Sequence, residues 1–190
     1  MIRTSESDPI RVAEVDVGTG RGKIGVTFAP GKNDGKSFGG SWARDLDKDL
    51  DAVAAWGAKA VVTLLEPQEL RWLAITRLGA EIERRGMEWV HMPIPDVSTP
   101  DAAFEAKWPE VSRSIRSRLD AGENILVHCR GGLGRAGMIA ARLLVETGGV
   151  EPEVAIERVR AVRPGAIETG AQERWVRTGP RPSRAADGLA

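Results

Sequence analysis

The sequence is poor in the residues that build disulfides and metal sites. Its 190 residues include one cysteine, two histidines and no tyrosine. A single cysteine excludes an intrachain disulfide and a cysteine-rich zinc site. Two histidines also make a metal site built from cysteine and histidine alone implausible. We therefore expect neither a metal nor another cofactor.

An excess of one charge and long hydrophobic runs are also lacking. Twenty-seven Lys and Arg balance twenty-seven Asp and Glu, for a formal net charge of zero. This balance favours neither a nucleic acid nor a membrane surface as a partner. No apolar run approaches the ~18 residues that span a bilayer, and the polar N-terminus lacks the apolar stretch of a secretory signal. We expect a monomer in the cytoplasm.

Hydrophobic residues make up 42% of the chain and charged residues 28%, which is typical of a globular protein. The length suits one domain with a real core. We expect residues 1–40 to form N-terminal strands and a loop packed on the domain, residues 41–178 to form the main domain, and residues 179–190 to form a disordered tail.

Hydrophobic periodicity predicts strands that alternate with helices. Strands are expected over residues 10–17, 23–28, 58–65, 87–94 and 124–128, with the first two as a hairpin. Helices are expected over residues 46–56, 67–85, 135–147, 152–162 and 170–177. Another helix should start at Pro100 with Thr99 as its N-cap, and Pro109 should break or kink it. This alternation predicts an α/β fold: a central, mostly parallel sheet with helices on both faces and a short N-terminal hairpin.

A glycine-rich loop joins the strand that ends at His128 to the next helix. It reads Cys129-Arg130-Gly131-Gly132-Leu133-Gly134-Arg135. Three glycines let successive N–H groups point inward as an anion-binding nest, and the helix adds its own N-terminal N–H groups. Arg135 offers a planar fork for two phosphate oxygens. The same positive field favours a thiolate at Cys129, so the loop is suited to both a nucleophile and the dianion that it attacks.

This loop resembles the signature of the cysteine-based protein phosphatases, His-Cys, five residues, then Arg. The full run from His128 to Arg135 is similar to that of the cyclin-dependent kinase-associated phosphatases in the dual-specificity group. The resemblance extends upstream to Pro93-Ile94-Pro95-Asp96 with Thr99-Pro100-Asp101, and downstream to Gly165-Ala166-Ile167-Glu168-Thr169 and Gln172. It covers Trp42 to Trp175 and implies a phosphatase-like fold.

The resemblance implies catalysis in two steps. Cys129 would form a phosphocysteine, while Arg135 and the loop residues from Arg130 to Gly134 hold the phosphate oxygens. Asp96 is our choice for the general acid, because its loop follows a strand that ends at the same edge of the sheet. Asp101 is the alternative, although stabilisation of a helix N-terminus explains it equally well.

Two further residues are given supporting roles by the same resemblance. His128 would support the cysteine loop through hydrogen bonds rather than transfer a proton. The alternative, a buried core histidine with its hydrogen bonds made, predicts nearly the same structure. Gln172 resembles a glutamine that places the hydrolytic water in some cysteine phosphatases, and the alternative is an exposed polar residue of a C-terminal helix.

The sequence departs from the family at Ala136, where most members have Ser or Thr. That hydroxyl normally donates to the cysteine sulfur and eases its departure in the second step. We therefore expect slow breakdown of the phosphocysteine. The same departure raises an alternative, a weakly active or non-catalytic phosphate-binding pseudophosphatase.

Arg130 is the only additional basic residue inside the loop, which favours a phosphoprotein or a small aryl phosphate over a polyanion. We expect phosphotyrosine, phosphoserine or phosphothreonine in proteins, with a phosphorylated small molecule as the alternative. A sulfurtransferase also uses a loop cysteine, but His128 and Arg135 argue against it. Glu66 and Glu69 could rim the site, and we prefer to read them as the acidic N-terminus of a helix.

Overall fold

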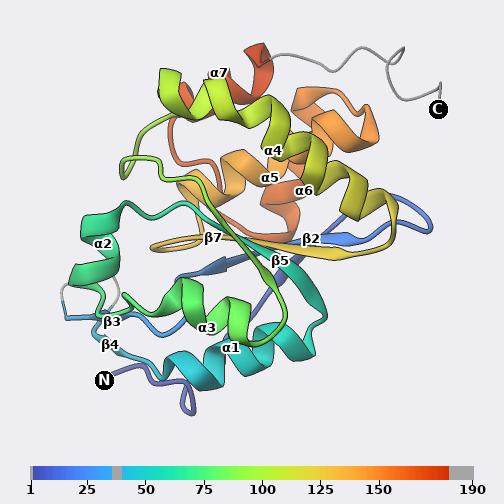
Figure 1. The fold of residues 1–190 in the computed structure, drawn as a ribbon. Coiled ribbons are helices and arrows are strands. Elements are labelled where there is room, and N and C mark those ends of the chain that lie inside the picture. The colour runs from blue at the N-terminus through green and yellow to red at the C-terminus, as the bar shows by residue number, and fades with distance from the viewer. Residues whose placement is uncertain (1, 36–39, 180–190) are drawn as a thin grey trace.

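The computed structural model describes residues 2–35 and 40–179 of the chain (Figure 1). Its strands are β1 (Ala13–Asp16), β2 (Lys23–Phe28), β3 (Asn33–Asp34), β4 (Trp42–Ala43), β5 (Ala58–Thr63), β6 (Glu88–His91) and β7 (Asn124–Cys129). Its helices are α1 (Leu46–Ala55), α2 (Pro67–Trp72), α3 (Leu78–Arg84), α4 (Ala102–Asp120), α5 (Gly134–Gly148), α6 (Pro152–Val162) and α7 (Gly170–Thr178). None of the helices within these ranges is long and apolar enough to cross a membrane.

The main sheet has the strand order β1-β2-β7-β5-β6. β1 pairs with β2 in antiparallel fashion, as a hairpin. The pairs β2–β7, β7–β5 and β5–β6 are all parallel. The predicted α/β fold with a mostly parallel sheet and an N-terminal hairpin is therefore confirmed.

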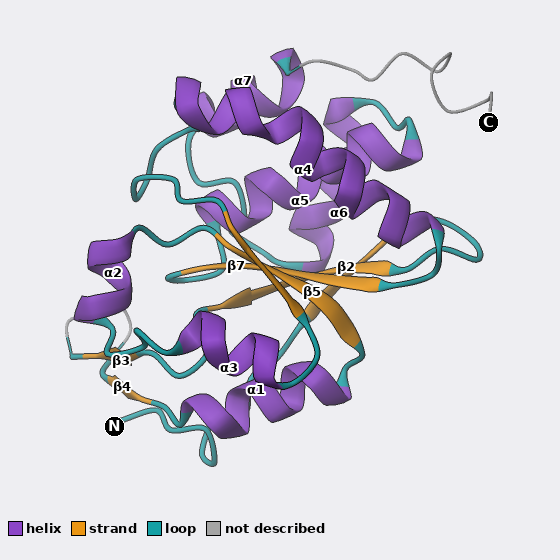
Figure 2. Cartoon of the chain, viewed as in Figure 1, coloured by secondary structure: helices purple, strands orange, loops and turns teal. Residues whose placement is uncertain are grey.

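Helices cover both faces of this sheet. α1 and α3 lie on one face, and α4, α5, α6 and α7 lie on the other (Figure 2). The central strand β7 is buried from both sides: Ile125 and Val127 belong to the core under α4 to α7, while Leu126 belongs to the core under α1 to α3. A strand buried on both faces reads as a continuous apolar run, which is why the sequence predicted it well.

Helix α5 lies at the centre of the larger layer and is buried from Gly134 to Glu146. A helix that is buried on all sides must be surrounded by other elements, and α5 contacts β2, β7, α4, α6 and α7. It begins directly after the Cys129 loop, so the most enclosed helix of the domain fixes one end of that loop.

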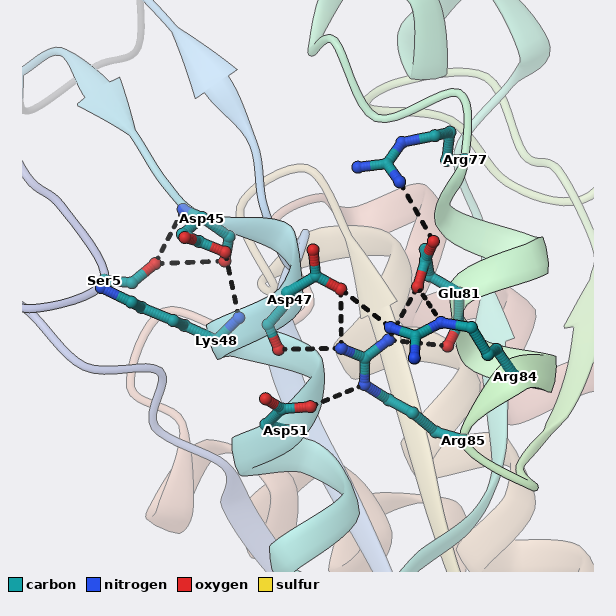
Figure 3. Close-up of polar contacts among 9 residues, drawn as sticks. All are labelled: Ser5, Asp45, Asp47, Lys48, Asp51, Arg77, Glu81, Arg84 and Arg85. Carbon is teal, nitrogen blue, oxygen red and sulfur yellow. Dashed lines mark hydrogen bonds and ion pairs between the residues drawn. The ribbon is translucent and has the colours of Figure 1, made fainter.

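An ion-pair network joins α1 to α3 (Figure 3). Arg85, at the end of α3, donates to Asp47 and Asp51 of α1 and to Glu81 of its own helix, with N–O distances of 2.8–3.0 Å. Burial by itself would lower the pKa of Arg85, but these three carboxylates outweigh it and raise the pKa above its ordinary value. The network holds α1 and α3 together on the face of the sheet opposite α5 (Figure 2).

The predicted helix over residues 67–85 is wrong as a single element. α2 ends at Trp72, and α3 starts at Leu78. Ala74 between them has a φ of 56°, a left-handed conformation that ends a helix. The break lets Leu73 and Ile75 both enter the core, at 3% and 1% exposure.

Helix α4 also differs from the prediction at its N-cap. Its N-cap is Asp101 rather than Thr99: the Asp101 carboxylate accepts the N–H of Phe104 at 2.8 Å. Pro109 lies within the helix and does not break it. The buried residues Phe104 and Trp108 on the inner face hold the helix together across the missing N–H.

The remaining differences are small. The strands predicted over 10–17, 58–65 and 87–94 are shorter in the structure. The loop predicted at the end of residues 1–40 contains β3, which pairs with β4. Residues 36–39 of that loop, and the predicted tail beyond residue 179, lie outside the described residues. The domain boundaries stay predictions.

Candidate active site

The Cys129 loop and the Asp96 loop lie at the same edge of the sheet. β7 ends at Cys129 and β6 ends at His91. These strands are parallel, so their carboxyl ends meet at one edge, where open α/β sheets bind ligands. Arg135 and Asp96 are in contact there, which brings together two of the three residues predicted to be catalytic.

Cationic side chains hold the carbonyl groups of the loop from outside. Lys32 donates from Nζ to the carbonyl oxygen of Arg130 at 3.1 Å. Arg163 donates to the carbonyl oxygens of Gly131 and Gly132, each at 2.9 Å. The N–H groups of Gly131 and Gly132 donate to no other residue in the described part of the chain. With the carbonyls held in this way, the loop keeps its N–H groups for an anion.

Two of the loop glycines lie close to neighbouring atoms, and at Gly132 those atoms belong to fixed backbone. Gly132 has a φ of 67°, and a Cβ there would lie 2.3 Å from the backbone carbon of Thr27. A Cβ on Gly134 would lie 2.3 Å from a carboxylate oxygen of Glu168. The loop is therefore packed tightly against β2 on one side and against the start of α7 on the other.

Arg135 is 2% exposed, and both of its terminal nitrogens have close partners. Its two terminal nitrogens donate to the two oxygens of Glu69, at 2.7 and 2.9 Å. Nη1 also donates to the carbonyl oxygen of Ile94 at 2.9 Å, and Nη2 lies 2.8 Å from Oδ1 of Asp96. Burial would lower the pKa of Arg135, but the bonds with Glu69, with the charges of Cys129 and Asp96, raise it above its ordinary value. The guanidinium is thus permanently charged and fixed in plane.

Glu69 has a partner that the sequence reasoning did not foresee. It does belong to the acidic N-terminus of α2, where it accepts the N–H of Glu66 at 2.9 Å in a capping box. It is also 4% exposed and pairs with Arg135. Helix capping alone therefore does not explain Glu69. A glutamate three residues into a helix after a buried strand was the signal available, but only the fold shows which cation it faces.

Cys129 is 4% exposed and belongs to the core cluster on the α5 side of the sheet. It is a free thiol at the base of the loop. Burial lowers the pKa of the nearby Arg163, and the negative charge of Cys129 opposes that shift. The cysteine thus lies within the electrostatic reach of cations that are themselves bound to the loop.

His128 is fully buried behind the loop. Its Nε2 lies 2.8 Å from Oγ1 of Thr63, and the same hydroxyl accepts the indole N–H of Trp89 at 2.9 Å. Burial lowers the pKa of His128 to about 3, and the neighbouring backbone of Cys129 opposes this shift only in part. A neutral histidine at physiological pH fits the supporting role that was predicted, which stays a prediction.

Gln172 is fully buried and is not the exposed helix residue that we considered as its alternative. Its Oε1 accepts the N–H of Glu168 at 2.9 Å, and its Nε2 donates to the carbonyl oxygen of Ser98 at 3.2 Å. Ser98 belongs to the same loop as Asp96, so Gln172 ties α7 to the loop of the predicted acid. Ala136, in the first turn of α5, is fully buried and has no hydroxyl to offer the cysteine.

The side chain of Arg130 points away from the centre of the loop. Its Nε and Nη2 lie 2.9 and 2.8 Å from Oδ2 of Asp34 in β3. Beside this pair is a pocket of about 460 Å³, also lined by Glu69, Leu73 and the exposed Trp72. A group that flanks a bound phosphate would find room there.

A buried cysteine under a glycine loop, closed by an anchored arginine at the edge of a parallel sheet, defines the class of cysteine-dependent phosphatase domains. Residues 39–176 match the family model described as PTP-SAK, Swiss Army Knife protein, DSP-PTPase phosphatase domain. The chain belongs to this family of dual-specificity and tyrosine phosphatase domains, and the predicted resemblance is confirmed.

Known proteins agree with this assignment. Mouse cyclin-dependent kinase inhibitor 3 is 32% identical over 127 residues, which cover 66% of this chain and 59% of that protein. The chain therefore spans about three fifths of the length of these curated relatives. The crystal structure of kinase associated phosphatase (KAP), with its catalytic-site cysteine substituted by serine, matches with a TM-score of 0.77 and 26% identity, covering 89% of this chain and 93% of that one. Tk-PTP in its active form matches with a TM-score of 0.63 and 31% identity, covering 85% and 92%.

Proposed function

We propose that the protein is a cysteine-dependent phosphatase that hydrolyses phosphomonoesters through a phosphocysteine, with phosphotyrosine, phosphoserine or phosphothreonine in proteins as its substrates. The observation that carries the proposal is the arrangement around Cys129. The loop carbonyls are held outward, its N–H groups are unpaired within the described residues, and Arg135 closes the ring. Such a site stabilises both a thiolate and a phosphate dianion.

In the first step, the Cys129 thiolate attacks phosphorus. The S–P bond forms as the bond between phosphorus and the leaving oxygen breaks, and Asp96 gives its proton to that oxygen. The loop N–H groups and Arg135 hold the equatorial phosphate oxygens through the transition state. The alcohol or phenol then leaves, and the phosphoryl group stays on sulfur.

The ion pair between Arg135 and Asp96 must open for this step. Nη2 of Arg135 lies 2.8 Å from Asp96, whose side chain is half exposed, whereas Glu69 on the other side of the guanidinium is buried. A phosphate dianion therefore displaces Asp96 rather than Glu69 from the arginine. Once displaced, Asp96 is free to take up a proton and to face the leaving oxygen.

In the second step, water attacks phosphorus and the S–P bond breaks. The Asp96 carboxylate takes a proton from the water, and Gln172 helps to place it. Sulfur leaves as a thiolate, and with Ala136 in the first turn of α5 no hydroxyl at that position eases its departure. Hydrolysis of the phosphocysteine therefore limits turnover.

The names of the relatives support a protein substrate, because they include a cyclin-dependent kinase inhibitor and a kinase associated phosphatase. A small phosphorylated molecule is the alternative substrate, and the pocket beside Arg130 could take either. Ala136 favours a second candidate function, a non-catalytic phosphate-binding domain. A cytoplasmic, monomeric protein remains our expectation.

The test uses p-nitrophenyl phosphate and a phosphotyrosine peptide with the wild type and three variants. Cys129→Ser should abolish hydrolysis. Asp96→Asn should lower kcat by about 10²-fold or more, with little change in the affinity for vanadate. Asp101→Asn is the matched control, because asparagine also caps a helix, and it should keep wild-type kcat. A wild type that binds vanadate but turns over neither substrate would favour the binding domain, and turnover of thiosulfate instead would favour a sulfurtransferase.

A further inference from the structure

Lys32 is a buried lysine next to the Cys129 loop. It is 2% exposed, while Lys23, Lys48, Lys59 and Lys107 are all exposed. It lies in the segment between β2 and β3, whose backbone is fixed by neighbouring elements: the N–H of Gly31 donates to Asp49 at 2.8 Å, and the N–H of Arg44 donates to the Lys32 carbonyl at 3.3 Å. The backbone of Lys32 is therefore held in place by neighbouring elements, and its side chain is buried rather than free in solvent.

Two aromatic rings surround the ammonium group. Nζ lies 4.1 Å from the ring centroid of Trp42 and 5.1 Å from that of Phe28. Its hydrogen-bond acceptor is the carbonyl oxygen of Arg130, the first residue after Cys129. Burying a cation costs free energy, which the ring faces and a single carbonyl offset only in part. A neutral side chain of similar size would fill this space at less cost, so packing does not explain a lysine here.

The charges around Lys32 include that of the predicted nucleophile. Burial lowers the pKa of Lys32 to about 8, Asp34 and Cys129 oppose that shift, and Arg130 and Arg44 add to it. Asp34 is also bound to Arg130, and Arg44 is bound to Asp49. The ammonium thus lies within the electrostatic reach of Cys129, as Arg163 does.

We propose that Lys32 is a positioning residue for the Cys129 loop: its ammonium holds the Arg130 carbonyl outward, and its charge favours the thiolate. This role rests on the proposed phosphatase function, which it deepens by adding a residue outside the signature motif. Arg163 does the same for the next two carbonyls, so the two cations together turn consecutive peptide units of the loop. As pH rises above 8, Lys32 loses its proton, and the loop loses this support.

Two variants separate the hydrogen bond from the charge. Lys32→Gln keeps a neutral donor for the Arg130 carbonyl, and Lys32→Met keeps the apolar stem against Trp42 and Phe28 with neither donor nor charge. Lys107→Met, an exposed lysine of α4, is the control. The chain has one cysteine, so alkylation by iodoacetamide reports on Cys129 alone.

The rate of alkylation is measured from pH 5 to pH 9, with and without inorganic phosphate as a protecting ligand, beside kcat/KM and thermal unfolding. Lys32→Met should slow alkylation at pH 6 by about 3- to 10-fold, since one opposite charge shifts such an equilibrium by up to about one pH unit. It should also weaken protection by phosphate and remove the fall of kcat/KM above pH 8. Lys32→Gln should slow alkylation equally but keep most of the protection by phosphate.

Alkylation profiles and phosphate protection equal to those of Lys107→Met, in both Lys32 variants, would overturn the proposal and leave Lys32 as a packing residue. A lowered melting temperature with unchanged alkylation in Lys32→Gln would do the same. A wild type that turns over no phosphomonoester would refute the proposed function, whereas the alkylation comparison would still decide the role of Lys32.

Discussion

Replacement of Glu69 should damage both the stability and the chemistry of the domain. Glu69 and Arg135 have 5% and 1% of their side chains exposed, and they share two hydrogen bonds of 2.7 and 2.9 Å. Without Glu69, Arg135 would keep the carbonyls of Ile94 and Leu64 and the half-exposed Asp96 as partners, with Asp96 the only charged one among the described residues. A buried cation would be left largely unpaired, which costs far more than the pair itself contributes.

The size of the effect follows from the bonds that are lost. Glu69→Ala breaks a buried pair and should lower the free energy of unfolding by about 3–5 kcal/mol. Glu69→Gln keeps one acceptor oxygen for Arg135 and should cost about 1–3 kcal/mol. A guanidinium that is no longer held in plane should also lower kcat/KM by about 10²-fold, because catalysis by the loop depends on alignment within an ångström.

Glu66→Ala is the matched control, since Glu66 shares the capping box of α2 with Glu69 but does not contact Arg135. Its cost should be about 1 kcal/mol, with wild-type kcat/KM. Urea unfolding and the hydrolysis of p-nitrophenyl phosphate measure the two effects. Equal losses of stability in Glu69→Ala and Glu66→Ala, with unchanged kcat/KM in both, would refute the reasoning.

Two more predictions concern the loop. Ala136→Ser restores a hydroxyl beside the cysteine and should raise kcat while shrinking the pre-steady-state burst of product; a wild type without a burst and no gain in the variant would contradict slow hydrolysis of the phosphocysteine. His128 has a pKa of about 3 in the folded state, below the ~6.5 of an unfolded histidine, so the unfolded state binds more protons between these values. Stability therefore decreases as the pH is lowered from about 6.5 towards 3, by at most ~1.4 kcal/mol per pH unit. His128→Asn should flatten this dependence in urea unfolding between pH 6 and pH 4, and an equal slope in both proteins would argue against a neutral, buried His128.

The sequence predicted the central elements well because their signals are local. The apolar run from Asn124 to Cys129 marks a strand buried on both faces, and the glycines that follow it mark a loop that must curl. Where local rules competed with packing, prediction failed. Ala74 has no local reason to adopt a positive φ, and it does so because Leu73 and Ile75 both enter the core. Pro109 ends many helices, yet α4 continues through it on the strength of its buried face.

The sequence by itself determined the family, the fold class and the identity of the loop from Cys129 to Arg135. The signals for all three are motifs and hydrophobic patterns within contiguous stretches of the chain. Only the tertiary structure decided what supports that loop. Glu69 is 66 residues from Arg135, and Lys32 is 98 residues from Arg130. No periodicity links positions so far apart; the parallel sheet brings them together by placing the ends of β2, β5 and β7 at one edge. Cys129 and Arg135 could therefore be identified from the sequence. The charged residues beside them, Glu69 and Lys32, can be identified only from the tertiary structure.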